Sequence, residues 1–314
     1  MPDLKLKTVT RTQGNNQPLK DGSVRPRTFA FDFEEVDPII AAFRRMVRGL
    51  EFDVCEMAIT TYICARAYGK RFTAVPVFLV RAFHHGAILH NTKAGIARPK
   101  DLEGRKVGVN RGYTVTTGVW ARGVLQDEHG VNLSKITWVL SGDEHVPEYR
   151  PPANVVPIDK GQKMEDRLAS GELAAAIGIE ASAPDVKPLI PNALEAGLVA
   201  LRRRGHYPIN HTVVIKDELL DAHPDLAADV FDAFAAAKRL YVERLKAGKI
   251  DKPTQVDEVH RRVMEITGDP LPYGIAPNRR VLEELIGHAL AQGIITRRVS
   301  VEELFAPSTH DLVA

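Results

Sequence analysis

The segment from residue 106 to 140 constrains most strongly how this chain can fold. Residues 106–109 read as a short strand, a glycine-containing loop follows, a helix is predicted over about 114–129 with Gly130 behind it, and 136–140 reads as the next strand. A strand, a helix and a second strand at this spacing form a βαβ unit with parallel strands. We therefore expect an α/β protein with a parallel sheet in this part of the chain.

The rest of the chain shows strands and helices without a repeat or a low-complexity linker. Strands are expected over 4–10, 24–33, 52–59, 73–80, 87–90, 174–179 and 210–215, and helices over 37–49, 60–69, 164–170, 223–245 and 278–292. The first of these helices has Asp37 as its predicted N-cap and Pro38 in its first turn. The length of 314 residues suffices for two lobes with a core each, and the missing linker suits lobes joined by crossing strands.

Composition and charge exclude several classes of partner. The chain is 44% hydrophobic and 26% charged, with a formal net charge of +2, so neither nucleic acid nor an anionic membrane is a predicted partner. The densest basic run, 202–204, reads as a solvated turn. Since no apolar stretch approaches the length of a membrane helix and the N-terminus alternates like a strand, we expect a cytoplasmic protein; a mature chain without its leader would look the same.

The two cysteines do not indicate whether the protein forms an oligomer. The two cysteines, Cys55 and Cys64, lie in apolar stretches and are expected to be buried thiols rather than a disulfide framework. The sequence leaves the oligomeric state open, a homo-oligomer included.

Several short segments carry a resemblance to known proteins. They are 52–58 (FDVCEMA), 80–85 (VRAFHH), 101–108 (DLEGRKVG), 112–114 (GYT), 149–150 (YR) and 208–211 (PINH). The pattern at 101–108 resembles the entry to the second lobe of type II periplasmic binding proteins. Together the segments resemble the 4,5-dihydroxyphthalate decarboxylase family over about residues 4–300, with departures at Ala58, where the family pattern has Ser, and at 84–85, where it has Arg-His.

The resemblance implies a fold, an activity and a domain division. The fold would be a two-lobed type II periplasmic-binding-protein-like α/β fold with a cleft between the lobes for a small aromatic carboxylate. Lobe 1 would comprise residues 1–92 and 206–314, and lobe 2 residues 93–205. The activity would be decarboxylation of a dihydroxyphthalate-like acid to protocatechuate and CO₂, whereas the fold alone would also suit a non-catalytic solute-binding protein.

The chemistry of such a decarboxylation sets what the protein must supply. Loss of CO₂ from an aromatic acid is easier after the ring carbon that bears the carboxylate has been protonated, because a hydroxyl para to that carbon stabilises the cation. The protein then needs a binding site for carboxylates, a proton donor near the ring and a group that polarises the phenolic hydroxyls. This route requires no cofactor.

Candidate substrate-binding residues lie at predicted strand ends and at one helix start. Arg81 and Arg111 are candidate carboxylate clamps, because a guanidinium group matches a carboxylate bidentately. The loop before the helix at 114 offers backbone N–H groups to an anion, although simple capping by Thr114 is the alternative. The full predicted set is Arg81, Arg111, Tyr113, Thr114, Thr116, Thr117, Arg150 and, more weakly, Tyr273.

Candidate catalytic residues are His84, His85, His211 and Glu56. Histidine titrates near neutral pH and can deliver a proton; an extended backbone would place His84 and His85 on opposite faces, and His85 is slightly favoured. Glu56 lies in an apolar strand, where a carboxylate needs a partner such as one of these histidines or an arginine. A metal bound by these four residues is the rival interpretation, which their spacing does not favour, and no metal is predicted. An enzyme of pyrimidine or thiamine-precursor chemistry is a third, weaker alternative that would need a reactive thiol.

Overall fold

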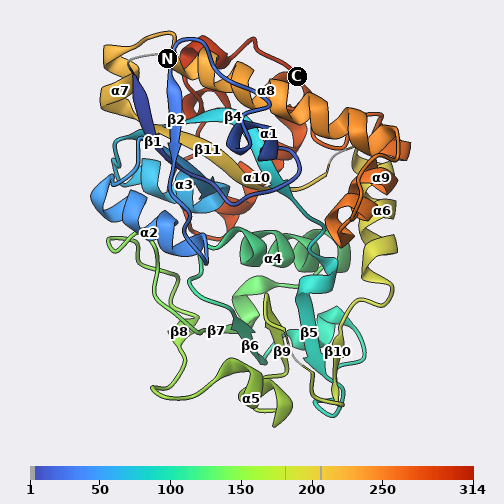
Figure 1. Ribbon diagram of the computed structural model, residues 1–314. Coiled ribbons are helices and arrows are strands. Elements are labelled where there is room, and N and C mark those ends of the chain that lie inside the picture. The colour runs from blue at the N-terminus through green and yellow to red at the C-terminus, as the bar shows by residue number, and fades with distance from the viewer. Residues whose placement is uncertain (1–3, 181, 206) are drawn as a thin grey trace. The chain divides into compact units, whose positions relative to one another are not determined.

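The computed structural model describes residues 4–180, 182–205 and 207–314, and the chain divides into two compact units (Figure 1). Unit 1 comprises Met1–Ala82, Gly205–Glu284 and Val299–Ala314, and unit 2 comprises Phe83–Arg204 and Leu285–Arg298. Residues 83–92 and 285–298 thus group with unit 2, whereas the predicted division assigned them to lobe 1. The predicted boundary at His206 falls outside the described residues. The cleft between the lobes stays a prediction.

The sheet of unit 1 has five strands in the order β2-β1-β3-β11-β4. β1 pairs in parallel with β2 and β3, and β11 runs antiparallel between β3 and β4. Because β11 is antiparallel to β3 and β4, its first residues lie beside the last residues of those two strands. This register places Ala58, Arg81 and His211 at the same end of the three strands. The strands are Lys5–Val9 (β1), Ala30–Phe33 (β2), Val54–Ala58 (β3), Phe72–Arg81 (β4) and Ile209–Lys216 (β11).

Helices cover the sheet of unit 1. α2 and α3 contact β3, and the long α8 contacts β4 and α1 (Figure 1). The apolar spacing predicted for α2 is confirmed, since Phe43, Met46 and Val47 are buried. The helices are Gln17–Lys20 (α1), Ile40–Gly49 (α2), Ile59–Ala67 (α3), Asp217–Ala222 (α7), Leu226–Lys246 (α8), Gln255–Thr267 (α9) and Arg279–Ala291 (α10), the last with its residues from Leu285 onward in unit 2.

The sheet of unit 2 has six strands in the order β10-β5-β9-β6-β7-β8. β6 pairs in parallel with β7 and β9, so the parallel sheet predicted for residues 106–140 is confirmed. β5 pairs with β9 and β10 and therefore belongs to this sheet. The strands are Ile88–Asn91 (β5), Lys106–Val109 (β6), Thr137–Leu140 (β7), Val155–Pro157 (β8), Ala175–Ile177 (β9) and Val186–Pro188 (β10).

Three α-helices of unit 2 follow its strands: Thr116–His129 (α4), Met164–Ala169 (α5) and Ala193–Arg204 (α6). α4 ends as predicted, because Gly130 adopts the left-handed conformation of a C-cap. The basic run 202–204 is not a turn before a strand; it forms the last turn of α6, where cations face the negative end of the helix dipole.

Some helix boundaries differ from the predicted ones. α2 begins at Ile40 with Ile39 as its N-cap, so the predicted cap at Asp37 is wrong. The long helix predicted from His223 begins instead at Leu226, and His223 caps the end of α7. No described helix is both long and apolar enough to cross a membrane, and the cytoplasmic location stays a prediction.

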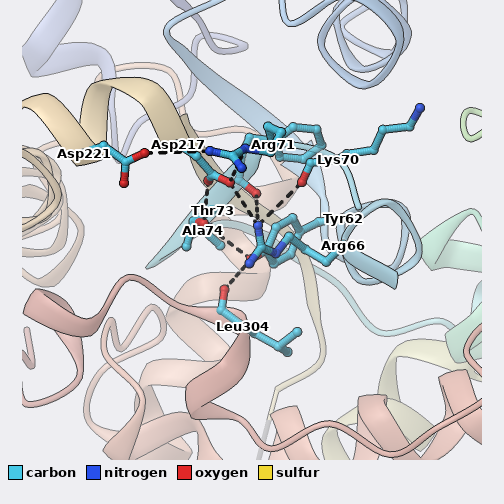
Figure 2. A network of polar contacts seen from close by, with 10 residues as sticks. Tyr62, Arg66, Lys70, Arg71, Thr73, Ala74, Asp217, Asp221 and Leu304 are labelled. Carbon is cyan, nitrogen blue, oxygen red and sulfur yellow. Dashed lines mark hydrogen bonds and ion pairs between the residues drawn. The ribbon is translucent and has the colours of Figure 1, made fainter. Parts of the chain in front are cut away.

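The hydroxyl of Tyr62 joins three segments of unit 1. Tyr62 on α3 is fully buried, accepts a hydrogen bond from the Ala74 N–H of β4 at 3.1 Å, and donates one to the Leu304 carbonyl. Figure 2 shows this group beside the ion pair of Arg66 and Asp217, whose side-chain atoms lie 3.3 Å apart. The C-terminal segment is therefore fastened to the sheet by buried polar contacts as well as by apolar packing.

Replacing Tyr62 by Phe is expected to lower the free energy of unfolding by about 1–3 kcal/mol, because the buried N–H of Ala74 and carbonyl of Leu304 lose their partner. Urea unfolding followed by circular dichroism measures the change. Tyr68→Phe, at a side chain that is 42% exposed, is the control and should shift stability by less than about 0.5 kcal/mol. Equal unfolding midpoints for Tyr62→Phe and wild type would contradict the assigned role.

Candidate active site

A buried carboxylate and a histidine form a close pair in unit 1. Glu56 on β3 is fully buried, and His211 lies on the neighbouring strand β11, one diagonal step away in the antiparallel register. Glu56 Oε1 is 2.6 Å from His211 Nδ1, and Glu56 Oε2 accepts the Arg11 backbone N–H at 2.8 Å. The structure therefore brings together two of the predicted catalytic residues, and it gives Glu56 the histidine partner that its burial requires.

The geometry of this pair fixes the orientation of the imidazole. Nδ1 is hydrogen-bonded to the carboxylate, so Nε2 is the ring nitrogen left for another partner, and the His211 side chain is 15% exposed. The Phe43 ring packs edge-on against the imidazole, with ring centroids 5.2 Å apart. A carboxylate that orients one ring nitrogen and stabilises the imidazolium form is the arrangement that makes a histidine an effective proton donor and acceptor.

Arg81 is held inside unit 1 by neutral oxygen atoms. Its guanidinium donates to the carbonyls of Tyr207 at 2.7 Å and Pro272 at 2.9 Å and to the Asn278 side-chain oxygen. Burial lowers the pKa of Arg81 to about 10, so the group stays charged at neutral pH. This placement makes Arg81 an internal anchor that ties the end of β4 to the loop at 272–278, and it does not favour the predicted role as a carboxylate clamp.

Tyr273 lies in the same interior region. Its side chain is fully buried, and burial raises the pKa of its phenol above the usual value. The ring contacts the Lys238 ammonium at 5.4 Å and packs on the Phe231 ring at 6.5 Å. Tyr273 is therefore a neutral interior group rather than a side chain that reaches out to a ligand.

A cavity of about 670 Å³ lies in unit 1. Arg11, whose backbone N–H donates to Glu56, is one of its lining residues, whereas Glu56 and His211 are not. Four cationic side chains line it, and Tyr241, Ile250 and Val256 add apolar walls. The cationic residues are Arg11, Arg244, Lys249 and Lys252.

His260 lies at the wall of this cavity in a buried polar network. Its Nδ1 is 2.8 Å from the Tyr241 hydroxyl, which also donates to Asp257 at 2.6 Å. Burial lowers the pKa of His260 to about 4. His260 is therefore neutral near pH 7, and its protonation opposes folding.

The loop before α4 in unit 2 holds a carboxylate of the same chain. The backbone N–H groups of Tyr113 and Thr114 both donate to Glu144, and the Thr114 hydroxyl donates to Glu144 Oε2 at 2.7 Å. In the structure the anion at this loop is the Glu144 carboxylate of the same chain, and binding of a ligand's carboxylate there stays a prediction. Thr114 does not cap the helix, because α4 begins at Thr116 with Val115 as its N-cap.

The other predicted residues of this loop flank it. Arg111 adopts a left-handed conformation with φ of 69°, and its N–H donates to the Ser141 hydroxyl at 2.7 Å. Thr116 is buried and Thr117 is partly exposed in the first turn of α4. The structure therefore gathers Arg111, Tyr113, Thr114, Thr116 and Thr117 in one stretch, although the partner that organises the loop comes from the turn after β7.

His85 lies at the far end of α4 from this loop. It is buried in a single 3₁₀ turn, and its Nε2 is 3.0 Å from Glu128, which also pairs with Arg204 at 3.2 Å. Burial raises the pKa of Glu128, but the hydrogen bond and charge of His85 and the charge of Arg204 outweigh it, so the pKa lies below its usual value. Glu128 is twelve residues beyond Thr116, about 18 Å along the helix, so His85 and the loop do not form one site within unit 2.

His84 and Arg150 also have structural partners. The backbone at His84 and His85 is not an extended strand, and both side chains are buried; the His84 ring stacks on Trp120 with ring centroids 6.5 Å apart. Arg150 is exposed and donates to the carbonyls of Pro147 at 2.6 Å and Tyr149 at 2.9 Å. These placements favour local structural roles over the predicted catalytic and binding roles.

The rival interpretation of a metal site finds no support in the geometry of the predicted ligands. Within residues 4–180, 182–205 and 207–314, no group of three close metal-binding side chains includes Glu56, His84, His85 or His211. His85 and His211 each pair with a different carboxylate in a different unit.

Two functional candidates escaped the sequence analysis. Glu144 lies in an ordinary acidic turn, and Arg122 lies within a helix, where no local pattern distinguishes it from an exposed arginine. Arg122 is in fact fully buried and donates to the Tyr113 carbonyl at 2.6 Å. The one signal in the sequence was the spacing of Arg122, which lies three and four residues after Val119 and Gly118 and therefore on the same face of the helix.

Solved structures with this architecture define the class of fold. The periplasmic aliphatic sulphonate binding protein SsuA from Escherichia coli matches with a TM-score of 0.54 at 12% identity, over 98% of this chain and 99% of that one. The CA3427 gene product of Candida albicans, described as exhibiting the generic periplasmic binding protein structural fold, matches with a TM-score of 0.51 at 13% identity, over 95% and 92% of the chains. The chain therefore has a periplasmic-binding-protein-like fold; at these identities the likeness concerns the fold alone.

Sequence relatives identify the family within this class. 4,5-Dihydroxyphthalate decarboxylase from Comamonas testosteroni is 30% identical over 335 aligned positions, which cover 98% of this chain and 98% of that protein. The enzyme of the same name from Pseudomonas putida is 34% identical over 176 positions, 52% of this chain and 65% of that protein. No family model matches the chain. The chain belongs to the 4,5-dihydroxyphthalate decarboxylase family and is a carboxy-lyase.

The lowered pKa of His260 predicts a loss of stability in mild acid. The unfolded chain takes up a proton near pH 6.5 and the folded chain only near pH 4, so stability is complete above pH 6.5 and falls as the pH is lowered toward 4. His260→Gln should remove this contribution, and the loss of unfolding free energy between pH 7 and 4.5 should be smaller than in wild type by on the order of 2 kcal/mol.

Urea unfolding at the two pH values measures the difference. The exposed His223, replaced by Gln, is the matched control and should keep the wild-type pH dependence. An identical pH dependence for His260→Gln and wild type would show that His260 titrates normally.

Proposed function

We propose that this chain converts 4,5-dihydroxyphthalate, or a closely related hydroxylated aromatic acid, to the corresponding phenolic acid and CO₂, with His211 as the proton donor. The observation that carries the proposal is the 2.6 Å contact between His211 Nδ1 and the fully buried Glu56. The names of the two relatives support the substrate class.

The reaction is a replacement of CO₂ by a proton on one ring carbon. His211 Nε2–H donates its proton to the ring carbon that bears the carboxylate, and the para hydroxyl stabilises the resulting cation. The bond from the ring carbon to the carboxylate then breaks, its electron pair restores the aromatic ring, and CO₂ leaves. Glu56 orients the imidazole through its contact with Nδ1, and the partly exposed imidazole recovers a proton from water.

The cavity of unit 1 supplies a setting for an anionic aromatic molecule. Its four cationic side chains outnumber the two carboxylates, of Asp251 and Asp257, that also line it, and its apolar walls suit a ring. Arg11 links the cavity to the pair, since it lines the cavity and donates its backbone N–H to Glu56.

The same chemistry needs no electron sink from a cofactor. Protonation before C–C cleavage avoids an aryl anion, and the hydroxyl of the substrate itself carries the positive charge. We therefore propose a cofactor-independent reaction, in which the protein contributes proton transfer and electrostatic stabilisation.

Replacement of either member of the pair should lower kcat by about 10²- to 10⁴-fold, because His211→Gln removes the donor and Glu56→Gln removes the charge that orients and stabilises it. Release of CO₂ and formation of protocatechuate from 4,5-dihydroxyphthalate are measured together. His223→Gln, at an exposed histidine of the same unit, should keep the wild-type rate.

Since Glu56 is buried, each variant is also unfolded in urea, so that loss of fold and loss of proton transfer are separated. Full activity in folded His211→Gln would reject His211 as the donor. No turnover of any hydroxylated phthalate by wild type would reject the proposed function.

Cofactor independence predicts that activity survives prolonged dialysis against a chelator and gel filtration. The expected kcat equals that of untreated protein within error, and added divalent metal leaves it unchanged. A loss of activity that a metal or a small cofactor restores would contradict this part of the proposal.

A further inference from the structure

Two side-chain amides of the loop that follows β1 line the cavity of unit 1. They belong to Gln13 and Asn15, and every other residue that lines the cavity is also part of unit 1. Within the described ranges 4–180, 182–205 and 207–314, neither Gln13 Nε2 nor Asn15 Oδ1 has a hydrogen-bond partner, although both atoms are buried. A buried polar atom without a partner costs about 1–3 kcal/mol, so a ligand that supplied the missing hydrogen bonds would be favoured.

The contacts of Asn15 fix which end of its amide is left for a ligand. Its Nδ2 donates to the Leu79 carbonyl of β4 at 3.0 Å, so Oδ1 is the remaining atom. The side chain is 2% exposed, and Asn15 is one of the residues that line the cavity. An amide oxygen only accepts hydrogen bonds. A carboxylate therefore cannot serve as its partner, whereas a hydroxyl group can.

The loop that carries both amides is held in place by its own side chains and by α8. Asn16 Oδ1 accepts the Gln13 N–H at 2.8 Å, and Asn16 Nδ2 donates to the Arg11 carbonyl at 2.8 Å. A Cβ on Gly14 would lie 2.4 Å from the Tyr241 ring, so glycine at this position lets the loop pack against α8. The amides are therefore positioned before a ligand arrives, which reduces the entropy lost on binding.

The rest of the cavity wall suits the other groups of a hydroxylated aromatic acid. The four cationic side chains attract carboxylates, and Tyr241, Ile250 and Val256 provide apolar contacts for a ring. Gln13 Nε2 is a donor and Asn15 Oδ1 is an acceptor, whereas a phenolic hydroxyl both donates and accepts. Different groups of the cavity thus match the carboxylates and the hydroxyls of such a ligand.

We propose that Asn15 and Gln13 determine the specificity of this cavity for hydroxylated aromatic acids. Asn15 Oδ1 accepts a hydrogen bond from a phenolic hydroxyl, and Gln13 Nε2 donates one to a phenolic oxygen. The inference rests on the proposed function for the substrate class, and it adds the residues that distinguish a hydroxylated acid from one of the same shape without hydroxyls. An acid without hydroxyls leaves both amide atoms unpaired and therefore binds more weakly.

The test compares protocatechuate with 3,4-difluorobenzoate, in which fluorine atoms replace both hydroxyls and the carboxylate is kept. Protocatechuate is the product of the proposed reaction, so it is not consumed during the measurement. Isothermal titration calorimetry of wild type is expected to give a Kd for 3,4-difluorobenzoate that is about 10- to 100-fold higher than the Kd for protocatechuate. Asn15→Leu, which removes the acceptor at similar side-chain size, should raise the Kd for protocatechuate and reduce this ratio to about twofold.

The control and the contrary outcomes concern the same ratio of Kd values. Gln255→Leu replaces an exposed amide of unit 1 outside the cavity wall and should keep the wild-type ratio. If Asn15 only fastens the loop to Leu79, Asn15→Leu raises both Kd values by the same factor, which overturns the proposal. An unchanged ratio in Asn15→Leu, or no preference for protocatechuate in wild type, overturns it as well.

A second variant keeps the proposal testable if Asn15→Leu does not fold. Gln13 is only partly buried, so Gln13→Leu should leave the fold intact and lower the ratio about threefold. Nuclear magnetic resonance of ¹⁵N-labelled wild type should show larger shifts of the Asn15 and Gln13 side-chain amides with protocatechuate than with 3,4-difluorobenzoate. Equal shifts with both ligands, or no shift of either amide, would show that the hydroxyls bind elsewhere.

The outcomes separate this inference from the proposed function. Absence of CO₂ release from 4,5-dihydroxyphthalate by wild type would reject the proposed function, whereas the ratio of Kd values does not depend on turnover. His211→Gln should lose turnover and keep the wild-type ratio, because His211 is not one of the lining residues of the cavity.

Discussion

The carboxylate of Glu56 is the group on which the arrangement of unit 1 depends. A fully buried carboxylate is costly unless hydrogen bonds and a partner charge compensate for its lost hydration. Here the compensation comes from two other segments: the Arg11 N–H, which follows β1, and His211 on β11. Glu56 therefore joins the ends of three neighbouring strands at one point, and the same contacts that offset its burial also orient the imidazole.

Buried arginines serve a similar structural purpose in each unit. Arg81 and Arg122 are both almost completely inaccessible, and both donate to backbone carbonyls and to a side-chain amide oxygen. Each thereby fixes a chain segment that follows or precedes a strand end. A guanidinium can do this because its several donors lie in one rigid plane and reach acceptors on different segments, whereas the donors of a lysine ammonium all lie on one nitrogen atom.

The sequence predicted the local structure and the need of Glu56 for a partner, whereas the identity of that partner depended on strand register. The βαβ unit at 106–140 follows from local spacing, and so does α2 with its buried Phe43. A buried carboxylate demands a partner, so the search for one among the histidines was justified, but the choice of His211 over His85 is made by the pairing of β3 with β11, 155 positions apart in the chain. Nothing local marks His85 as the partner of Glu128.

The fold that this chain shares with a sulphonate-binding protein does not by itself distinguish binding from decarboxylation. Binding an anion requires hydrogen-bond donors and positive charge but no acid–base group. Decarboxylation requires in addition that a proton reach carbon, and that the donor be recharged each turn. In the proposed mechanism the partly exposed imidazole of His211 would meet both conditions, since Glu56 holds one ring nitrogen and leaves the other for proton transfer. In that mechanism the burial of Glu56 matters because a solvated carboxylate would hold the imidazole less firmly.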